Sequence, residues 1–258
     1  MSGMVRFSFA LSQRMRSFLE VRDALHCLDL ALEQQQPRDW LHAACDLRAS
    51  LLGDQGRKSV IPEVVGLLIS MQTHLNQLGK DIPQYKEGIE QACRTLDAHV
   101  QVLHAGLPDA INFLAQDALI NAYLNTQKKQ DWLGHKLGLP QSLDTLWSGN
   151  DERSSWLHHN LKGLNAAVRD LNQMLNDYVQ WEEGIAVGGC GQIAPERGSS
   201  NGLLIIGLPE ASVASGIVPD ISGNKLAIRL RFQRWVPGEP PQEVSEDQPY
   251  AMMLIPVA

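Results

Sequence analysis

Apolar residues recur every three or four positions through the first two thirds of the chain, which is the spacing of one buried face of an α-helix. The first such stretch has these apolar positions: Leu11, Met15, Phe18, Leu19, Leu25 and Leu28. Ser12 stands where its hydroxyl can accept a hydrogen bond from a free backbone N–H at the helix start. A second stretch lies between Pro37 and Gly53, the usual order of a proline in the first turn and a glycine after the last. We predict a helix in each stretch.

The same spacing predicts further helices over about residues 59–78, 83–106, 108–125 and 151–181, with a short helix over 143–147 before the last one. Asn150 can cap the last helix, which is the longest. Its apolar side is broad: Trp156, Leu157, Leu161, Leu164, Val168, Leu171, Met174, Leu175 and Val179. A stripe of this width is either core or a surface for a partner.

Spacing and composition both change after Glu183. Residues 184–202 are rich in glycine, and short runs of strand length follow at 203–208, 225–232 and 251–257. Runs of this length with glycine and proline between them predict strands. Strands that follow helices without alternating with them indicate an α+β chain. We predict a helical domain over residues 1–183 and a smaller antiparallel β domain over residues 184–258.

Positive charge is concentrated in residues 221–235, which carry four cations and no carboxylate in a chain of 258 residues with a formal net charge of -7. Successive residues of a strand face opposite sides. We expect one side to face the core: Leu226, Ile228, Leu230 and Phe232. We expect the other side to face outward: Lys225, Ala227, Arg229 and Arg231. This outer side is either an anion-binding face or a solvated face whose cations protect a sheet edge.

Two weaker groups of cations lie elsewhere in the chain. Arg57 and Lys58 fall in the break between the second and third predicted helices, and Arg14, Arg16 and Arg22 lie on the first helix. The excess of acidic residues argues against a general nucleic-acid binder, because neutralising phosphates needs an extended basic face. A local site for an anionic partner is still compatible with this charge.

The sequence contains no set of residues with the spacing of a catalytic or metal site. His42 with Cys45, and His158 with His159, lack the third and fourth ligands that zinc needs. The GGCG sequence around Cys190 has no Gly-Lys-Ser/Thr ending, so we interpret it as a turn or linker and not as a phosphate loop. We expect a protein that is not an enzyme and needs no cofactor. The alternative is an enzyme centred on this glycine-rich segment and Cys190.

The apolar runs are all shorter than the roughly 18 residues of a membrane span. The first residues lack the uninterrupted apolar segment of a secretory signal. The four cysteines are far apart and form no CxxC pair, so we expect them to be reduced. These features predict a cytoplasmic protein without direct membrane insertion.

Two parts of the sequence resemble the ZapD family of bacterial cell-division proteins. The basic segment resembles a family phrase close to ISGxKxRxxIRF through these residues: Ile221, Ser222, Gly223, Lys225, Arg231 and Phe232. The first helix resembles the start of the family sequence through Leu11, Met15, Arg16 and Leu19. The order of a helical domain followed by a smaller β domain is also similar.

The resemblance implies a partner and a mechanism. ZapD proteins bind the tubulin-like GTPase FtsZ and bundle its filaments, so the implied partner is the C-terminal tail of FtsZ at the mid-cell division septum. The implied contacts are cations of both predicted domains: Lys225, Arg229, Arg231, Arg57, Lys58, Arg22 and Arg16. Bundling further implies a homodimer, because two identical sites can hold two neighbouring filaments.

The chain departs from the family pattern at several cations. Ala227 replaces the middle arginine of the basic phrase, although Arg229 supplies a guanidinium on the same strand face. The stretch from Ala115 to Ala118 contains no cation where the family has two arginines. Because these cations are absent, we retain an alternative in which the protein has the same fold but is a binding adaptor for a different protein partner.

Overall fold

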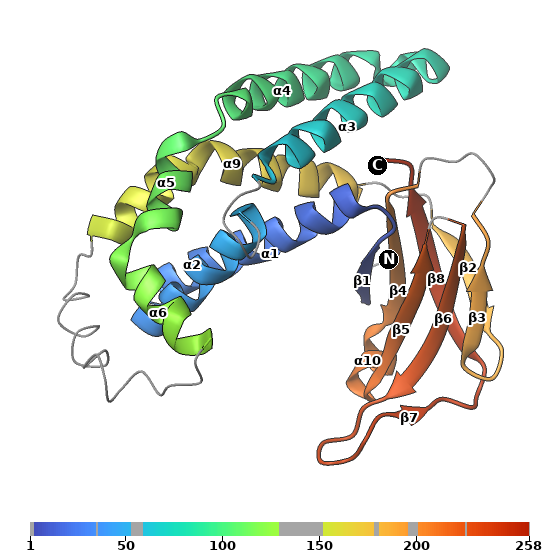
Figure 1. Ribbon diagram of the computed structural model, residues 1–258. Helices are drawn as coiled ribbons and strands as arrows, with labels where there is room; N and C mark the ends of the chain where they lie inside the picture. Colours follow the sequence, from blue (N-terminus) through green and yellow to red (C-terminus); the bar gives the residue numbers. More distant parts are fainter. Residues whose placement is uncertain are drawn as a thin grey trace. The chain divides into compact units, whose positions relative to one another are not determined.

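A computed structural model describes residues 3–34, 36–52, 59–128, 152–177, 181–195, 201–224 and 226–257. The chain forms two compact units (Figure 1), one made of residues 1–16 with 173–258 and the other of residues 17–172. Helices dominate the second of these units, and antiparallel strands dominate the first. The α+β class and the smaller antiparallel β part predicted from the sequence are therefore confirmed. We call the two parts the β unit and the helical unit.

The helices lie close to the predicted stretches. Their bounds are α1 (Gln13–Glu33), α2 (Pro37–Leu52), α3 (Ile61–Asp81), α4 (Lys86–His104), α5 (Pro108–Gln116), α6 (Ala118–Lys128) and α9 (Glu152–Asp177), with a 3-10 turn over Pro83–Tyr85. Ser12 caps α1 as expected, since the backbone N–H of Met15 donates to its hydroxyl at 3.1 Å. The short helix expected at 143–147 and the cap expected at Asn150 lie outside the described residues.

Helix α9 contributes a long apolar side to the helical unit. Leu157, Leu161 and Leu164 are buried on it, while Trp156 is 42% exposed. Gly163 allows α4 to approach closely, because a Cβ there would lie 2.7 Å from the Cγ1 of Val102. The broad stripe predicted for this helix is therefore mainly core.

Polar side chains connect α9 to its neighbours beside this apolar side. His99 of α4 lies 2.8 Å from a carboxylate oxygen of Asp170. On the side of α1, the amide of Asn165 donates to the carboxylate of Asp29 at 3.0 Å. These bonds satisfy polar groups at the margin of the core, where an unpaired group would cost free energy.

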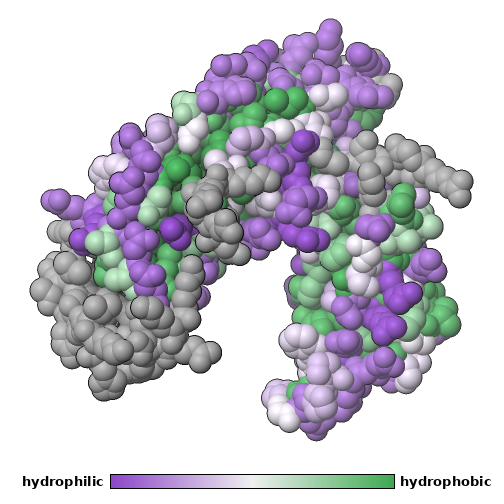
Figure 2. Space-filling model, viewed as in Figure 1, coloured by the Kyte–Doolittle hydropathy of each residue, from purple (hydrophilic) through white to green (hydrophobic). Residues whose placement is uncertain are grey.

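Helices α3 and α4 pack along their length. Their apolar residues meet in the seam between them, including Leu68 and Met71 of α3 and Leu96 and Val100 of α4, all of which are buried. Figure 2 shows mainly hydrophilic residues on the visible outer side of this helix pair. The pattern is that of two amphipathic helices sharing one apolar contact.

The helix predicted over residues 108–125 is interrupted at Asp117. This residue has φ -56° and ψ 127°, and its carboxylate accepts hydrogen bonds from the N–H groups of Leu119 at 2.9 Å and Ile120 at 3.0 Å. It is thus the N-cap of α6. Apolar spacing continues across the break, so the sequence pattern concealed it.

The β unit contains two four-stranded sheets. The first sheet has the order β1 (Met4–Ala10), β4 (Leu203–Pro209), β8 (Gln248–Ile255) and β2 (Glu182–Ala186). The second sheet has β6 (Ala227–Arg234) between β3 (Cys190–Ile193) and β5 (Ile217–Asn224), with β7 (Gln242–Glu243) also paired to β6. Neighbouring strands are antiparallel. A short helix, α10 (Glu210–Ala214), connects β4 to β5.

The two sheets share one hydrophobic core. Its buried residues include Leu204 and Ile206 of the first sheet and Ile228 and Leu230 of the second. The alternation predicted for β6 is confirmed at Ile228, Leu230 and Phe232, which are 0%, 0% and 1% exposed. Contact between two inner faces of this kind is typical of a β-sandwich.

The expectation that Leu226 faces the core is wrong. Leu226 is 72% exposed, because it lies in the turn before β6 begins at Ala227. Its N–H donates to the side chain of Asn224 at 2.9 Å, which holds the turn. Strand alternation therefore does not extend to this residue.

Strand β4 is buried on both faces. Leu204 and Ile206 face the shared core, and Leu203 and Ile205, which point to the opposite face, are each only 2% exposed. A strand without a solvated face has no need of polar alternation. This explains the uninterrupted apolar run at 203–208.

The predicted boundary between residues 183 and 184 differs from the observed units. Strand β1 pairs with β4 from Met4 opposite Pro209 to Ala10 opposite Leu203, and Phe7 and Phe9 pack against the core of the β unit. The first strand therefore belongs with the last third of the chain, and the helical unit is inserted between β1 and β2. Spacing along the chain does not reveal a pairing between segments almost 200 residues apart.

The glycine-rich segment around Cys190 forms the tight turn between β2 and β3. Gly188 and Gly189 have φ of 57° and 71°, values that suit glycine at both positions of a hairpin turn. A side chain at Gly189 would also clash with the backbone of Val244. The interpretation as a turn is confirmed. Within the described ranges, the helices are too short or too polar to cross a membrane.

We expect Asp117→Ala to lower the free energy of unfolding by about 1 kcal/mol, because two N–H groups of α6 lose their acceptor. Asp117→Asn should keep most of the stability, since an asparagine oxygen can accept the same bonds. Urea denaturation followed by circular dichroism measures both. Equal destabilisation by the two variants would show that the ion pair of Asp117 with Arg153, at 3.4 Å, matters more than the cap.

Candidate functional site

The exposed side of β6 carries two neighbouring arginines. Arg229 lies between Gln192 of β3 and Ser222 of β5, and Arg231 lies between Cys190 of β3 and Asp220 of β5. Both arginines are exposed, whereas the residues between and beside them point into the core. We call this surface, formed by Arg229 and Arg231 with these four neighbours, the arginine face.

Two shallow grooves run along the arginine face. The larger, about 380 Å³, is lined by Cys190, Gly191, Gln192, Arg229 and Arg231. The smaller, about 180 Å³, is lined by Gln192, Ser222, Gly223, Ala227, Ile228 and Arg229. Arg229 borders both grooves, so a ligand in either one would meet its guanidinium.

Neighbouring strands bring carboxylates to this face. A guanidinium nitrogen of Arg231 lies 3.9 Å from a carboxylate oxygen of Glu243 on β7, and Asp220 stands opposite Arg231 on β5. The guanidinium of Arg229, by contrast, makes no hydrogen bond or ion pair with the other residues that the structure describes, although the Arg229 backbone is part of the β6 ladder. The face is therefore less positive than the sequence of β6 alone suggests. An exposed ion pair such as Arg231–Glu243 contributes about 0–1 kcal/mol, so a ligand can replace it.

The remaining cation of β6 points away from the arginine face. Arg234 has the opposite strand parity, and its guanidinium lies 3.4 Å from the carboxylate of Glu246. Of the other predicted contacts, Lys225, Arg57 and Lys58 lie outside the described residues. The structure therefore describes three of the four cations of residues 221–235, and two of them, Arg229 and Arg231, lie on the arginine face.

The two predicted cations of α1 fall in different units. Arg16 is exposed in the first turn of α1 and belongs to the β unit. Arg22 belongs to the helical unit, where its guanidinium donates to Asp23 at 2.8 Å and to Asn172 at 3.3 Å. These bonds occupy Arg22 within its own unit.

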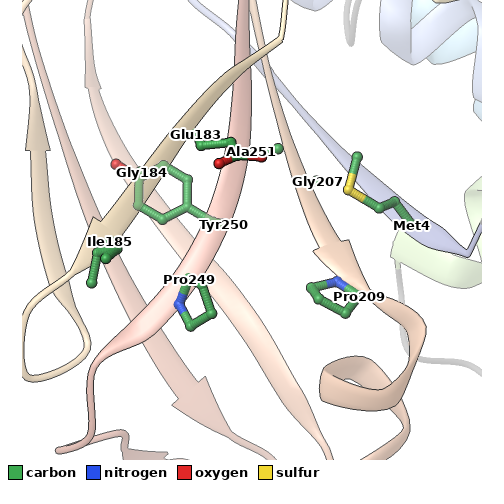
Figure 3. A pocket seen from close by; sticks show the side chains of 9 residues that line it. All are labelled: Met4, Glu183, Gly184, Ile185, Gly207, Pro209, Pro249, Tyr250 and Ala251. Atoms are coloured by element: carbon green, nitrogen blue, oxygen red, sulfur yellow. The ribbon is translucent and has the colours of Figure 1, made fainter. Parts of the chain in front are cut away.

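A larger groove, which the sequence did not indicate, lies on the first sheet (Figure 3). Its volume is about 630 Å³, and it is lined by Met4, Glu183, Gly184, Ile185, Gly207, Pro209, Pro249, Tyr250 and Ala251. The residues come from all four strands of the sheet, so no local motif marks them. Glu183 is the charged residue in the lining of this groove, and most of the other lining residues are apolar. The groove suits binding better than proton-transfer chemistry.

Tyr250 lines this groove and also belongs to the core of the β unit. Its ring packs 5.9 Å from that of Phe232, measured between centroids, and it runs so close to Gly184 that a Cβ there would clash. Burial raises the pKa of the Tyr250 hydroxyl. The side chain therefore remains protonated and serves packing.

Two of the histidines considered as metal ligands, His42 and His158, lie beside carboxylates. His42 lies 3.6 Å from Asp46 within α2, and His158 lies 3.4 Å from Asp29 of α1. Throughout the described ranges, no three residues among histidine, cysteine, aspartate and glutamate gather in a way that would hold a metal ion.

Two of the four cysteines are buried and two are exposed. Cys45 and Cys93 are buried, and Cys27 and Cys190 are exposed. Burial raises the pKa of the Cys45 thiol to about 12, and the Asp46 carboxylate acts in the same direction. Burial also raises the pKa of Cys93. Cys190 borders the larger groove of the arginine face.

No protein-family model and no curated protein matches the chain. The comparisons therefore add no family to the description of the site. Its interpretation depends on the exposed arginines, their acidic neighbours and the sequence resemblance of the β6 segment.

We expect brief treatment of the folded chain with a thiol reagent at about pH 8 to modify Cys27 and Cys190 and to spare Cys45 and Cys93, because only a thiolate reacts. Mass spectrometry of peptides identifies the labelled residues, and the urea-unfolded chain, in which all four should react, is the control. Fast labelling of Cys190 alone, well ahead of Cys27, would instead favour an activated nucleophile and the enzyme alternative.

Proposed function

We propose that the chain is a divergent member of the ZapD family that binds the C-terminal tail of FtsZ and bundles FtsZ filaments without enzymatic activity. The observation that carries the proposal is the exposure of Arg229 and Arg231 side by side on β6, along an open groove. Arg231 is also one of the residues through which the sequence resembles the family.

The arginine face can hold an acidic segment by charge-assisted hydrogen bonds. Guanidinium groups donate in a planar fork that fits carboxylates. Both arginines are exposed, so each contact is weakened by water and salt. Ordering a flexible tail costs further free energy. A single site should therefore bind weakly and reversibly.

Weak sites are sufficient where many tails are displayed together. A homodimer has two identical sites, and each can take a tail from a different filament. Filaments present tails at high local concentration, which strengthens the combined binding by roughly 10² to 10⁴. The proposed setting is the cytoplasmic side of the division septum, where FtsZ filaments assemble.

A second candidate is a binding adaptor of the same fold with a different acidic protein partner. It is favoured by Ala227, Ala115 and Ala118, which stand where the family has arginines, and by the carboxylates of Asp220 and Glu243 next to Arg231. Such a protein would still bind an acidic segment but would not bind FtsZ. Direct mixing with FtsZ separates the two candidates.

We expect the purified chain to increase the amount of polymerised FtsZ in a low-speed pellet, and Arg229→Ala/Arg231→Ala to reduce this increase several-fold, because many weak contacts are lost together. The matched control is Arg38→Ala/Arg94→Ala, which removes the same charge from exposed positions of the helical unit. Circular dichroism should show that both double variants are folded.

Three results would contradict parts of the proposal. If Arg229→Ala/Arg231→Ala pellets as much FtsZ as the original chain, the arginine face is not the binding site. No pelleting by the original chain would favour the second candidate. A chain that remains monomeric in sedimentation velocity at the concentrations used would exclude bridging by a dimer.

We also expect the affinity for a fluorescent FtsZ tail peptide to fall several-fold between about 0.1 M and about 0.5 M salt, since the Debye length at 0.1 M is about 10 Å and shortens as salt is added. Fluorescence anisotropy with the isolated peptide avoids the effect of salt on polymerisation. An affinity that does not change with salt would indicate apolar binding, for which the groove of the first sheet is the obvious place.

A further inference from the structure

The two arginines of the arginine face have a fixed spacing. They are two residues apart on one strand, so their Cα atoms lie roughly 7 Å from each other on the same side. Residues i and i+2 of an extended peptide share this spacing and also face one side. A ligand that lies extended along β6 can therefore present two carboxylates to Arg229 and Arg231 at once.

The neighbouring strands favour one side of β6 for this ligand. The larger of the two grooves on the arginine face, about 380 Å³ in volume, lies toward β3, where Cys190, Gly191 and Gln192 form its wall. On the other side, the exposed carboxylate of Asp220 stands opposite Arg231 and repels another carboxylate. An acidic segment should consequently lie over the β3 side.

The chain itself supplies a competitor for one of the two positions. Glu243 of β7 reaches Arg231 at 3.9 Å, and its side chain is 84% exposed. Strand β7 pairs with β6 just beyond the residues paired with β3, with Gln233 opposite Glu243. Arg229 has no such partner among the described residues. An incoming ligand thus meets one open arginine and one that already has a carboxylate.

We propose that the arginine face selects extended segments whose carboxylates alternate, in the pattern acid–x–acid. The first carboxylate binds Arg229, and the second displaces Glu243 from Arg231. The inference rests on the proposed function in that it takes the arginine face to be the partner site, but it specifies a ligand pattern that does not depend on FtsZ.

The pattern distinguishes ligands of equal charge. Adjacent acids point to opposite sides of an extended chain, so only one of them can face β6. Acids at i and i+3 also face opposite sides. Both kinds of segment should bind Arg229 and leave Arg231 with Glu243.

The test uses three fluorescein-labelled peptides of identical composition, which place two aspartates in an Ala, Gly and Ser background as Asp-Ala-Asp, Asp-Asp or Asp-Ala-Ala-Asp. We expect the alternating peptide to bind the full chain about two- to fivefold more tightly at low ionic strength, because its second carboxylate can approach Arg231 more closely than Glu243 does at 3.9 Å and an exposed ion pair allows no more than this. Fluorescence anisotropy measures the affinities. Arg229→Ala and Arg231→Ala should each abolish the preference.

The substitution Glu243→Gln removes the carboxylate that competes with the ligand for Arg231. It should raise the affinity for the alternating peptide about threefold and leave the other two peptides nearly unchanged. Glu246→Gln is the matched control, because Glu246 is equally part of the segment between β6 and β8 but pairs with Arg234 at 3.4 Å, away from the arginine face. It should change none of the three affinities.

Equal binding of the three peptides, or a preference that survives in both arginine variants, would overturn the inference. The same affinity change in Glu243→Gln and Glu246→Gln would overturn the role of Glu243 as competitor. Failure of the FtsZ proposal gives a different pattern, namely a clear preference for the alternating peptide together with no FtsZ in the pellet. If FtsZ pelleting depends on both arginines but the three peptides bind equally, the proposed function stands and the acid–x–acid preference is wrong.

Discussion

Burial of one side of β6 is the constraint on which the candidate site depends. Ile228, Leu230 and Phe232 lie in the core between the two sheets, which forces Arg229 and Arg231 to the opposite side. A shift of the strand by one residue would bring both guanidinium groups into the core, and an unpaired buried charge costs several kcal/mol. The apolar side chains thus determine where the charged ones point, and they hold the spacing of the arginines constant.

Tertiary pairing then moderates the charge of this surface. Asp220 of β5 stands opposite Arg231, and Glu243 of β7 lies 3.9 Å from it, so these two carboxylates offset much of the positive charge of the arginine face. In an acidic chain, such a surface attracts a short acidic segment without becoming a general site for polyanions. Modest affinity at each site also suits a protein that acts through many simultaneous contacts, because individual contacts can exchange while the assembly persists.

The chain path makes the β unit depend on both ends of the sequence. Strand β1 pairs with β4 across the inserted helical unit. The first sheet can be completed only after the last third of the chain has been synthesised, and closing so long a loop is entropically unfavourable and slow. The backbone hydrogen bonds within each helix are local and are not subject to this delay, so single helices can form before the first sheet is complete. The helical unit as a whole also has long-range contacts to close, because Asn165 of α9 bonds Asp29 of α1 across 136 residues.

The sequence by itself determined the features that depend on near neighbours. Helix positions, the Ser12 cap, the Gly188–Gly189 turn and the outward direction of Arg229 and Arg231 all follow from local spacing and backbone preference. Only the tertiary structure decided that β1 joins the β unit, that Glu243 reaches Arg231 and that four strands form the groove around Gly207. The β1 pairing and the groove join residues distant in the chain, and the contact of Glu243 with Arg231 joins two strands across the loop between them. Pairing of both kinds is set by the packing of whole sheets. The interruption at Asp117 is local, yet it escaped because aspartate is acceptable both inside a helix and as a cap, and only the packing of α5 and α6 selects between them.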